Sequence, residues 1–292
     1  MYSIVALNEP SSLPLEIDQD DFRKIKLGRK KLNRINDIEF NFWSVIEAHR
    51  ELVDCALLMA NERAHHYKFG GASLVMERNK ISSRLDLFLI AFERYVSTCP
   101  KMLPLLGIEN AKKLYFSPIF DENFPYRLCC KLRNFAAHYL SAADGIVVQH
   151  KRKNIGEVGE IAISASVLVK NLLSWGKLGD PLKRDLLGLE ESGETTIDLM
   201  VVARKVSSLV WGIHMSLRDL MAAAESGVRI DLELFTRDWK CRQGREFHHL
   251  QLFAKHDGQS VAFEIDDDAA INTIRGLTAG NSGLETFRVC SH

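Results

Sequence analysis

Apolar residues recur every three or four positions along two long segments in the first third of the chain, which is the spacing of an amphipathic helix. The first segment runs from about residue 38 to 69, and Gly70-Gly71 end it. The second runs from about residue 73 to 97, and Pro100 ends it. Because consecutive amphipathic helices bury their apolar faces against each other, we predict an antiparallel helical hairpin.

Two further helices are predicted in the middle of the chain. One runs from Tyr126 to Ala143 and is ended by Asp144-Gly145. The other opens at Thr195-Thr196, whose side chains are suited to cap a first turn, and it runs to about Ala224. Its apolar residues fall on one face, which is typical of a helix packed on a core.

Strands are predicted on both sides of this last helix. Residues 146–148 and 160–163 are rich in β-branched residues and are expected to pair as a hairpin, although 161–175 also fits a helix. Residues 247–254 and 260–265 flank His256-Asp257-Gly258-Gln259, and Asp-Gly between strand-like runs is typical of a hairpin turn. The shorter predicted elements are helices at 109–116 and 267–277 and a strand at 284–289.

Together these elements predict a mainly α protein, a helical bundle with a small C-terminal α+β appendage. The helical spacing gives way to strand-like runs after Gly227, so we expect a boundary there. The first twenty residues contain Pro10 and Pro14 and are expected to be extended or loosely held. The predicted organisation is an N-terminal arm with a basic segment at 1–37, a helical domain at 38–227 and the appendage at 228–292.

The composition allows a substantial core, since 46% of the 292 residues are hydrophobic. The 38 lysines and arginines equal the 38 aspartates and glutamates, so only a local basic surface can attract a polyanion. One strongly basic segment is residues 21–37. Contact with an RNA backbone and a solvated or partner-docking role are equally compatible with it.

The cysteines and histidines do not predict a metal site, and we expect no cofactor. The six cysteines include no CxxC pair. Cys241 comes closest to a ligand cluster, with His248, His249 and His256, but adjacent histidines on a strand point to opposite faces. No apolar run approaches the roughly 18 residues of a membrane span, and the start of the chain lacks the apolar run of a signal peptide. We therefore expect no membrane contact and a cytoplasmic location.

The helix predicted at 126–143 carries the candidate chemistry. At about 100° per residue, its apolar stripe consists of Leu128, Leu132, Phe135, Ala136 and Tyr139. The opposite face consists of Arg127, Lys131, Asn134 and His138, at spacings of four, three and four. Arg133 lies on the flank between the two. Three cations, an amide and an imidazole, with no carboxylate on the helix to neutralise them, favour a phosphodiester as the bound group.

Each residue type on this face suits the cleavage of RNA. The guanidinium of an arginine donates to two phosphate oxygens at once and keeps its charge. An imidazole exchanges its proton near neutral pH. A histidine placed here would deprotonate an RNA 2′-hydroxyl, which attacks its own 3′-phosphate, while an arginine stabilises the charge that develops on the phosphoryl oxygens. This chemistry needs no metal.

The stretch Leu132-Arg133-Asn134-Phe135-Ala136-Ala137-His138 resembles the motif of the HEPN family, in which arginine and a polar residue, often asparagine, precede a helical spacer and a histidine. The resemblance covers roughly residues 38–225. It implies a homodimer whose paired motif helices form one composite ribonuclease site that leaves a 2′,3′-cyclic phosphate. It also implies that Arg133 and His138 are catalytic, and that Asn134 orients the imidazole or binds phosphate. Many members are toxins or phage-defence effectors, which implies an antitoxin or defence-complex protein as a partner.

Other cations are candidate RNA contacts, with a solvated surface as the alternative. They are Arg127 and Lys131 on the motif helix and Lys151, Arg152 and Lys153 in the loop of the first predicted hairpin. Two other functions are compatible with the same residues. One is a HEPN-like module that binds nucleotide or RNA without cleaving it. The other is an interaction protein in which the Arg–His face forms a salt-bridged dimer seam.

Overall fold

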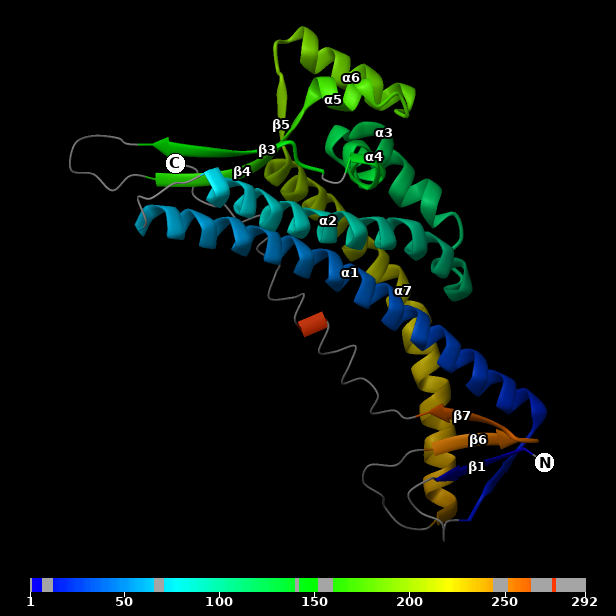
Figure 1. Ribbon diagram of the computed structural model, residues 1–292. Coiled ribbons are helices and arrows are strands. Elements are labelled where there is room, and N and C mark those ends of the chain that lie inside the picture. Colours follow the sequence, from blue (N-terminus) through cyan, green and yellow to red (C-terminus); the bar gives the residue numbers. More distant parts are fainter. Residues whose placement is uncertain are drawn as a thin grey trace. The chain divides into compact units, whose positions relative to one another are not determined.

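The computed structural model describes residues 2–6, 13–65, 71–139, 142–151, 160–243, 252–263 and 275–276, and this part of the chain is mainly α-helical, as predicted (Figure 1). Its α-helices are α1 (Gln19–His65), α2 (Gly71–Met102), α3 (Ser117–Glu122), α4 (Phe124–Tyr139), α5 (Val169–Ser174), α6 (Asp180–Glu191) and α7 (Leu199–Gln243). Its strands are β1 (Tyr2–Ala6), β2 (Leu15–Ile17), β3 (Gly145–Lys151), β4 (Glu160–Leu168), β5 (Thr196–Asp198), β6 (Leu252–His256) and β7 (Gln259–Phe263). Among the helices in these ranges, none has the length and apolar character needed to cross a membrane.

The chain folds into two compact units, each assembled from segments that are far apart in the sequence. The first unit combines Met1–Phe40, Lys101–Asn110 and His214–Ser282. The second contains Asn41–Pro100 and Ala111–Ile213. Helices α1 and α7 each contribute to both units, so the boundaries predicted at 37/38 and 227/228 both fall inside a continuous helix.

A four-stranded antiparallel sheet of order β2-β1-β6-β7 forms in the first unit. Ile4 of β1 lies opposite Ala254 of β6, and both side chains are buried. Of the two predicted alternatives for the first twenty residues, extended or loosely held, the extended one therefore holds for Tyr2–Ala6. The predicted β6–β7 hairpin is confirmed: Asp257 and Gly258 both have positive φ, 41° and 78°, as a type I′ turn requires.

Helix α1 begins at Gln19, well before the predicted start near residue 38. Asp18 caps it, because its side-chain Oδ1 accepts the N–H of Asp21 at 2.7 Å. Buried residues continue the apolar stripe upstream of the predicted start, at Phe22, Ile25, Leu32 and Ile35. A Cβ at Gly28 would lie 3.1 Å from Val228, so this glycine permits a close approach of α1 and α7.

Helix α7 differs from its prediction at both ends. Thr196 lies in β5, opposite Leu168 of β4, and the cap is Asp198, whose Oδ1 accepts the N–H groups of Met200 and Val201 at 2.8 and 3.1 Å. The helix passes through Gly227 and ends at Gln243. Compared with alanine, a glycine inside a helix lowers the stability of the helix by only about 1 kcal/mol. The buried stripe beyond it, at Val228, Leu232, Thr236 and Trp239, keeps the helix on its core.

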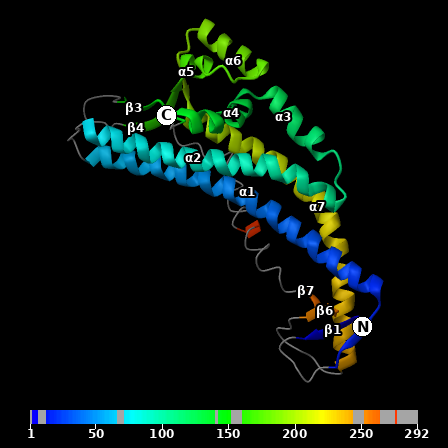
Figure 2. The ribbon, with the colours of Figure 1, turned by 45° about the vertical axis from the view of Figure 1, so that its right-hand side comes forward.

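In the second unit, α2 and the part of α1 after Asn41 run side by side as the predicted antiparallel hairpin (Figures 1 and 2). Phe42 packs on Tyr95 with ring centroids 6.2 Å apart, and Arg63 donates to the Glu77 carboxylate near the other end. The predicted hairpin of β3 and β4 is also confirmed, and β5 extends it to a three-stranded sheet. The helical alternative holds only after Leu168, where α5 begins.

Three shorter predictions have different outcomes. Residues 112–116 form a π-helical turn that leads into α3, close to the predicted short helix at 109–116. Of the predicted helix at 267–277, residues 275–276 are described, and they are helical. The strand predicted at 284–289 lies outside the described residues.

We predict that a buried histidine of the second unit makes the fold sensitive to acid. His49 of α1 is 4% exposed, and its ring centroid lies 6.0 Å from that of Phe88. Burial, with a smaller contribution from the charge of Arg204, lowers the pKa of His49 to about 4 from an ordinary 6.5. Between these values the unfolded chain binds a proton that the folded chain does not, so falling pH removes about 3 kcal/mol of stability.

His49→Leu should therefore reduce the loss of stability between about pH 7 and about pH 4.5. The free energy of unfolding in urea, measured at both pH values for the two proteins, checks this. An equal loss in both proteins would show that another group is responsible.

Candidate functional site

Helix α4, which carries the candidate catalytic residues, is anchored in the second unit by its apolar face. Leu128, Leu132 and Phe135 are fully buried, so the central part of the predicted apolar stripe is confirmed. The ring of Phe135 meets Trp175 edge-on at 5.6 Å. Near the start of the helix, Tyr126 meets Phe92 of α2 edge-on at 5.1 Å. These contacts fix the rotation of α4 about its axis and so decide which of its residues face solvent.

Arg127 does not belong to the solvent-facing set. It is buried, and its guanidinium contacts Asp185 of α6 at 2.8 and 2.9 Å. It also donates to the backbone carbonyls of Phe120 and Asp121 at 2.8 and 2.5 Å. These bonds tie α4 to α6 and to the end of α3. A guanidinium used in this way is not presented to a phosphate, and we leave Arg127 out of the proposed site.

Arg133 and Asn134 lie on the exposed side of α4. Arg133 forms an ion pair with Glu93 of α2 at 2.8 Å, and the two side chains are 46% and 40% exposed. Helix α2 thus supplies a carboxylate that the residues of α4 itself lack. A pair this exposed typically contributes about 0.2–1 kcal/mol, so a phosphate competes with it readily. Lys131, one turn before Phe135, is half-buried.

His138 follows Asn134 by one helical turn, and the helical backbone includes both residues. The side chains of His138 and Lys151, and the whole of Arg152 and Lys153, lie outside the described residues. Lys151 is the last residue of β3. The structure therefore brings Arg133 and Asn134 together on the surface of α4 and places residue 138 on the same helix.

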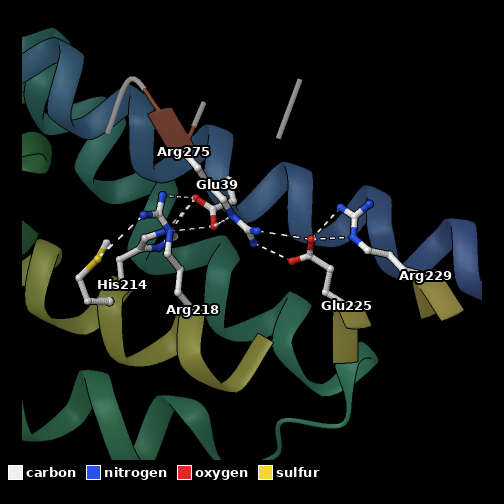
Figure 3. Close-up of polar contacts among 7 residues, drawn as sticks. Glu39, His214, Arg218, Glu225, Arg229 and Arg275 are labelled. Carbon is white, nitrogen blue, oxygen red and sulfur yellow. Dashed lines mark hydrogen bonds and ion pairs between the residues drawn. The ribbon is translucent and has the colours of Figure 1, made fainter. Parts of the chain in front are cut away.

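A second group of charged and polar residues, which the sequence pattern did not predict, surrounds two buried carboxylates in the first unit (Figure 3). Glu39 of α1 is fully buried and binds three partners: His214 and Arg218 of α7 at 3.1 and 2.6 Å, and Arg275 at 3.2 Å. Arg275 reaches on to Glu225 at 2.7 Å, which also binds Arg229 at 2.7 Å. This network joins α1, α7 and the segment at residues 275–276.

The electrostatics of the network are set by Glu39. Burial alone would raise the pKa of Glu39, but the hydrogen bonds from His214 and Arg218 outweigh it and hold the pKa at about 2. Burial lowers the pKa of His214 by more than the nearby Glu39 carboxylate raises it. The neutral His214 ring donates its Nε2–H, because a carboxylate only accepts. The arrangement is a charge-compensated core that fixes its three segments.

The sequence does contain a signal for this network. Glu39 lies next to Ile38 and three residues before Phe42, inside a buried apolar stripe. Glu225 likewise lies four residues after the buried Met221 and three residues before the buried Val228 on α7. A charged residue at core spacing indicates a buried ion pair, because burial of an unpaired charge is too costly.

Comparisons of the chain with protein-family models, with curated proteins and with solved structures found no match. Within the described ranges, no three or more histidine, cysteine, aspartate or glutamate side chains are grouped so as to hold a metal ion. The proposal for the function of the chain therefore rests on α4 and its neighbours.

We predict that the two arginines of α4 differ in their effect on stability. Arg127→Met leaves Asp185 and two backbone carbonyls without their donors, which should lower the free energy of unfolding by about 2–4 kcal/mol. Arg133→Met removes an exposed pair and should cost less than about 1 kcal/mol. Urea unfolding of both variants at neutral pH is the measurement, and equal losses would contradict the different roles.

We also predict a pH-dependent contribution from Glu39. Its pKa is about 2 in the folded chain against an ordinary 4.5, so the carboxylate stabilises the fold above about pH 4.5 and this contribution disappears as the pH falls through 2. Glu39→Gln should lower the free energy of unfolding by about 3 kcal/mol at neutral pH, and by less as the pH falls below about 4. Glu62→Gln, at an exposed position of the same helix, is the control and should change it by less than about 0.5 kcal/mol.

Proposed function

We propose that this chain is a metal-independent endoribonuclease of the HEPN type whose reacting groups lie on α4. The observation that carries the proposal is the solvent exposure of Arg133 and Asn134 on a helix whose other side is fixed in a core, with His138 one turn further along. A site on a rigid helix holds its groups in position more accurately than a loop does.

In the proposed reaction, the imidazole of His138 takes the proton of an RNA 2′-hydroxyl. The 2′-oxygen forms a bond to the adjacent phosphorus, and the bond from phosphorus to the 5′-oxygen breaks. The leaving 5′-oxygen receives a proton from a protonated imidazole, which gives a 2′,3′-cyclic phosphate and a 5′-hydroxyl. Proton transfer of this kind typically accelerates a reaction about 10²- to 10⁴-fold.

Arg133 stabilises the negative charge that develops on the phosphoryl oxygens. To do so, it exchanges the Glu93 carboxylate for the phosphate, which its planar guanidinium binds through two parallel hydrogen bonds. Asn134 orients the imidazole or donates to the phosphate. By resemblance to the HEPN family, the site is completed in a homodimer, where each copy supplies one set of these residues. A toxin or phage-defence role, with an antitoxin or defence-complex partner, is part of the same proposal.

The proposal predicts the loss of cleavage without loss of fold when His138 is replaced. Purified wild type and His138→Ala are incubated with labelled single-stranded RNA in the presence of EDTA, and product formation is followed. We expect His138→Ala to lower the rate at least about 10²-fold and Arg133→Ala to lower it about 10²- to 10³-fold. Arg184→Ala, at an exposed position of α6, is the control and should cleave as wild type does.

Two further measurements make this test specific. RNA with a 2′-deoxy residue at the cleavage position should resist the enzyme, because it lacks the attacking oxygen. Glu93→Gln should keep or raise the rate, because it releases Arg133 from its ion pair. Unchanged cleavage by His138→Ala would overturn the catalytic assignment.

The ion pair between Arg133 and Glu93 favours a second candidate, a HEPN-like module that binds RNA or nucleotide without cleaving it. An arginine already paired within its own chain is poised for exchange with an anion, and such exchange does not need chemistry to follow. Tight RNA binding by the wild type, without product under any of these conditions, would select this candidate.

A further inference from the structure

The cations of the chain are strongly concentrated at the start of α1. Residues 22–36 contain seven lysines and arginines and no aspartate or glutamate, whereas the whole chain has 38 of each sign. The seven are Arg23, Lys24, Lys26, Arg29, Lys30, Lys31 and Arg34. The structure shows that this stretch is helical throughout.

The helix sorts these residues by face. Its apolar residues, Phe22, Ile25, Leu32 and Ile35, are buried in the first unit. At about 100° per residue, the four cations opposite them lie within an arc of about 80° and along about 16 Å of the helix axis. We call these four the basic face, and they are Arg23, Lys26, Lys30 and Arg34. The first three are exposed and Arg34 is half-buried.

Among the residues that the structure describes, the acidic side chains paired with the basic face lie at its two ends. Asp20 pairs with Arg23 at 3.4 Å, and Asp37 pairs with Arg34 at 3.0 Å. All four side chains are more than a third exposed, and pairs of this kind contribute little. In the middle, Lys26 contacts the neutral side chain of Gln259 at 3.4 Å. Within the described part of the first unit, Lys26 and Lys30 at the centre of the face thus have no ion pair with a carboxylate, and the centre is positive.

We propose that the basic face binds the phosphate backbone of single-stranded RNA. The choice of RNA rests on the proposed function, whereas the choice of a polyanion rests on charge complementarity alone. Neighbouring cations on a helix face have Cβ atoms about 5–6 Å apart, so several phosphates of one strand are within reach of long, flexible side chains at once. Contacts of this kind release counterions and give an affinity that falls steeply with salt.

A membrane surface carries the same sign of charge but needs a different helix. A helix that lies on a bilayer inserts an apolar face between the lipids. The apolar face of α1 is occupied by the core of the first unit, and Leu27 is the large apolar side chain exposed in this stretch. The basic face therefore fits a dissolved polyanion better than a lipid surface.

The test compares two fourfold variants that lose the same charge. The first is Arg23→Gln, Lys26→Gln, Lys30→Gln and Arg34→Gln combined. The control is Arg78→Gln, Lys112→Gln, Lys183→Gln and Arg184→Gln combined, at exposed positions elsewhere. Both are made in the His138→Ala protein so that the RNA stays intact. Binding of a fluorescent single-stranded oligouridine is measured by anisotropy from low to moderate salt, after circular dichroism has shown equal helix content and melting.

The slope of log affinity against log salt is negative, and each lost phosphate contact reduces its magnitude by about 0.7, so the loss of four contacts should reduce it by about 3. At about 0.1 M salt, we expect the basic-face variant to bind at least tenfold more weakly than the control. Equal slopes and affinities for the two variants would overturn the inference. Loss of binding to vesicles containing phosphatidylserine, with RNA binding retained, would overturn it in favour of a membrane.

The inference and the proposed function fail separately. Cleavage by the wild type together with an unchanged salt slope in the basic-face variant overturns the inference and keeps the function. RNA binding that depends on the basic face, without cleavage by the wild type, supports the inference and overturns the nuclease.

Discussion

The fold depends on covering one apolar face along the whole length of two very long helices. Helix α1 has 47 residues and α7 has 45, and helices gain most of their stability in water from tertiary packing of such a face. In the first unit, α7 and the four-stranded sheet cover the apolar face of α1. In the second unit, α2 and the first part of α7 cover it, as the contact of Phe42 with Trp211 shows. The buried stripe of α1 continues from Phe22 to Met59, so a helix that ended between these residues would lose packing of its apolar face. Helix α4 packs in turn on α2, where Tyr126 meets Phe92.

The elements that the sequence predicted well are those specified by local chemistry. The Asp257-Gly258 turn and the β-branched runs of β3 and β4 have local sequence preferences that match their structure. The helical hairpin follows from the spacing of apolar residues alone. The errors arose where distant partners decide. Ile4 becomes part of a central strand because Ala254 pairs with it, and nothing near Ile4 indicates this. Gly227 is a residue type at which helices often end, yet α7 continues through it because the residues beyond it pack in the core.

The candidate site shows the same division between spacing and neighbours. Periodicity correctly separated the buried Leu132 from the exposed Asn134. It placed Arg127 on the same open face, because a helical wheel does not show that α6 covers that turn. Nor does it show that Glu93 of α2 lies beside Arg133. Two arginines six residues apart on one helix thus have different roles, and the carboxylates that distinguish them come from other helices. Resemblance of a short motif carries information about the residues in it but none about these partners.

The charges of the chain follow from where water is excluded. Glu39 is buried, so its charge has to be paired, and a histidine and two arginines bind it. These partners stabilise the fold. The basic face of α1 is exposed to water, which screens the repulsion among its cations. These cations can therefore exchange their weak partners for an anion. A chain of zero net charge exerts little attraction on RNA at long range, but fields decay over about 8 Å at physiological ionic strength. A run of cations about twice that long acts on nearby phosphates as a local field, whatever the rest of the surface carries. If the proposed function is correct, electrostatic binding of RNA and its cleavage by proton transfer involve different residues, so that each set of residues has to meet only one requirement.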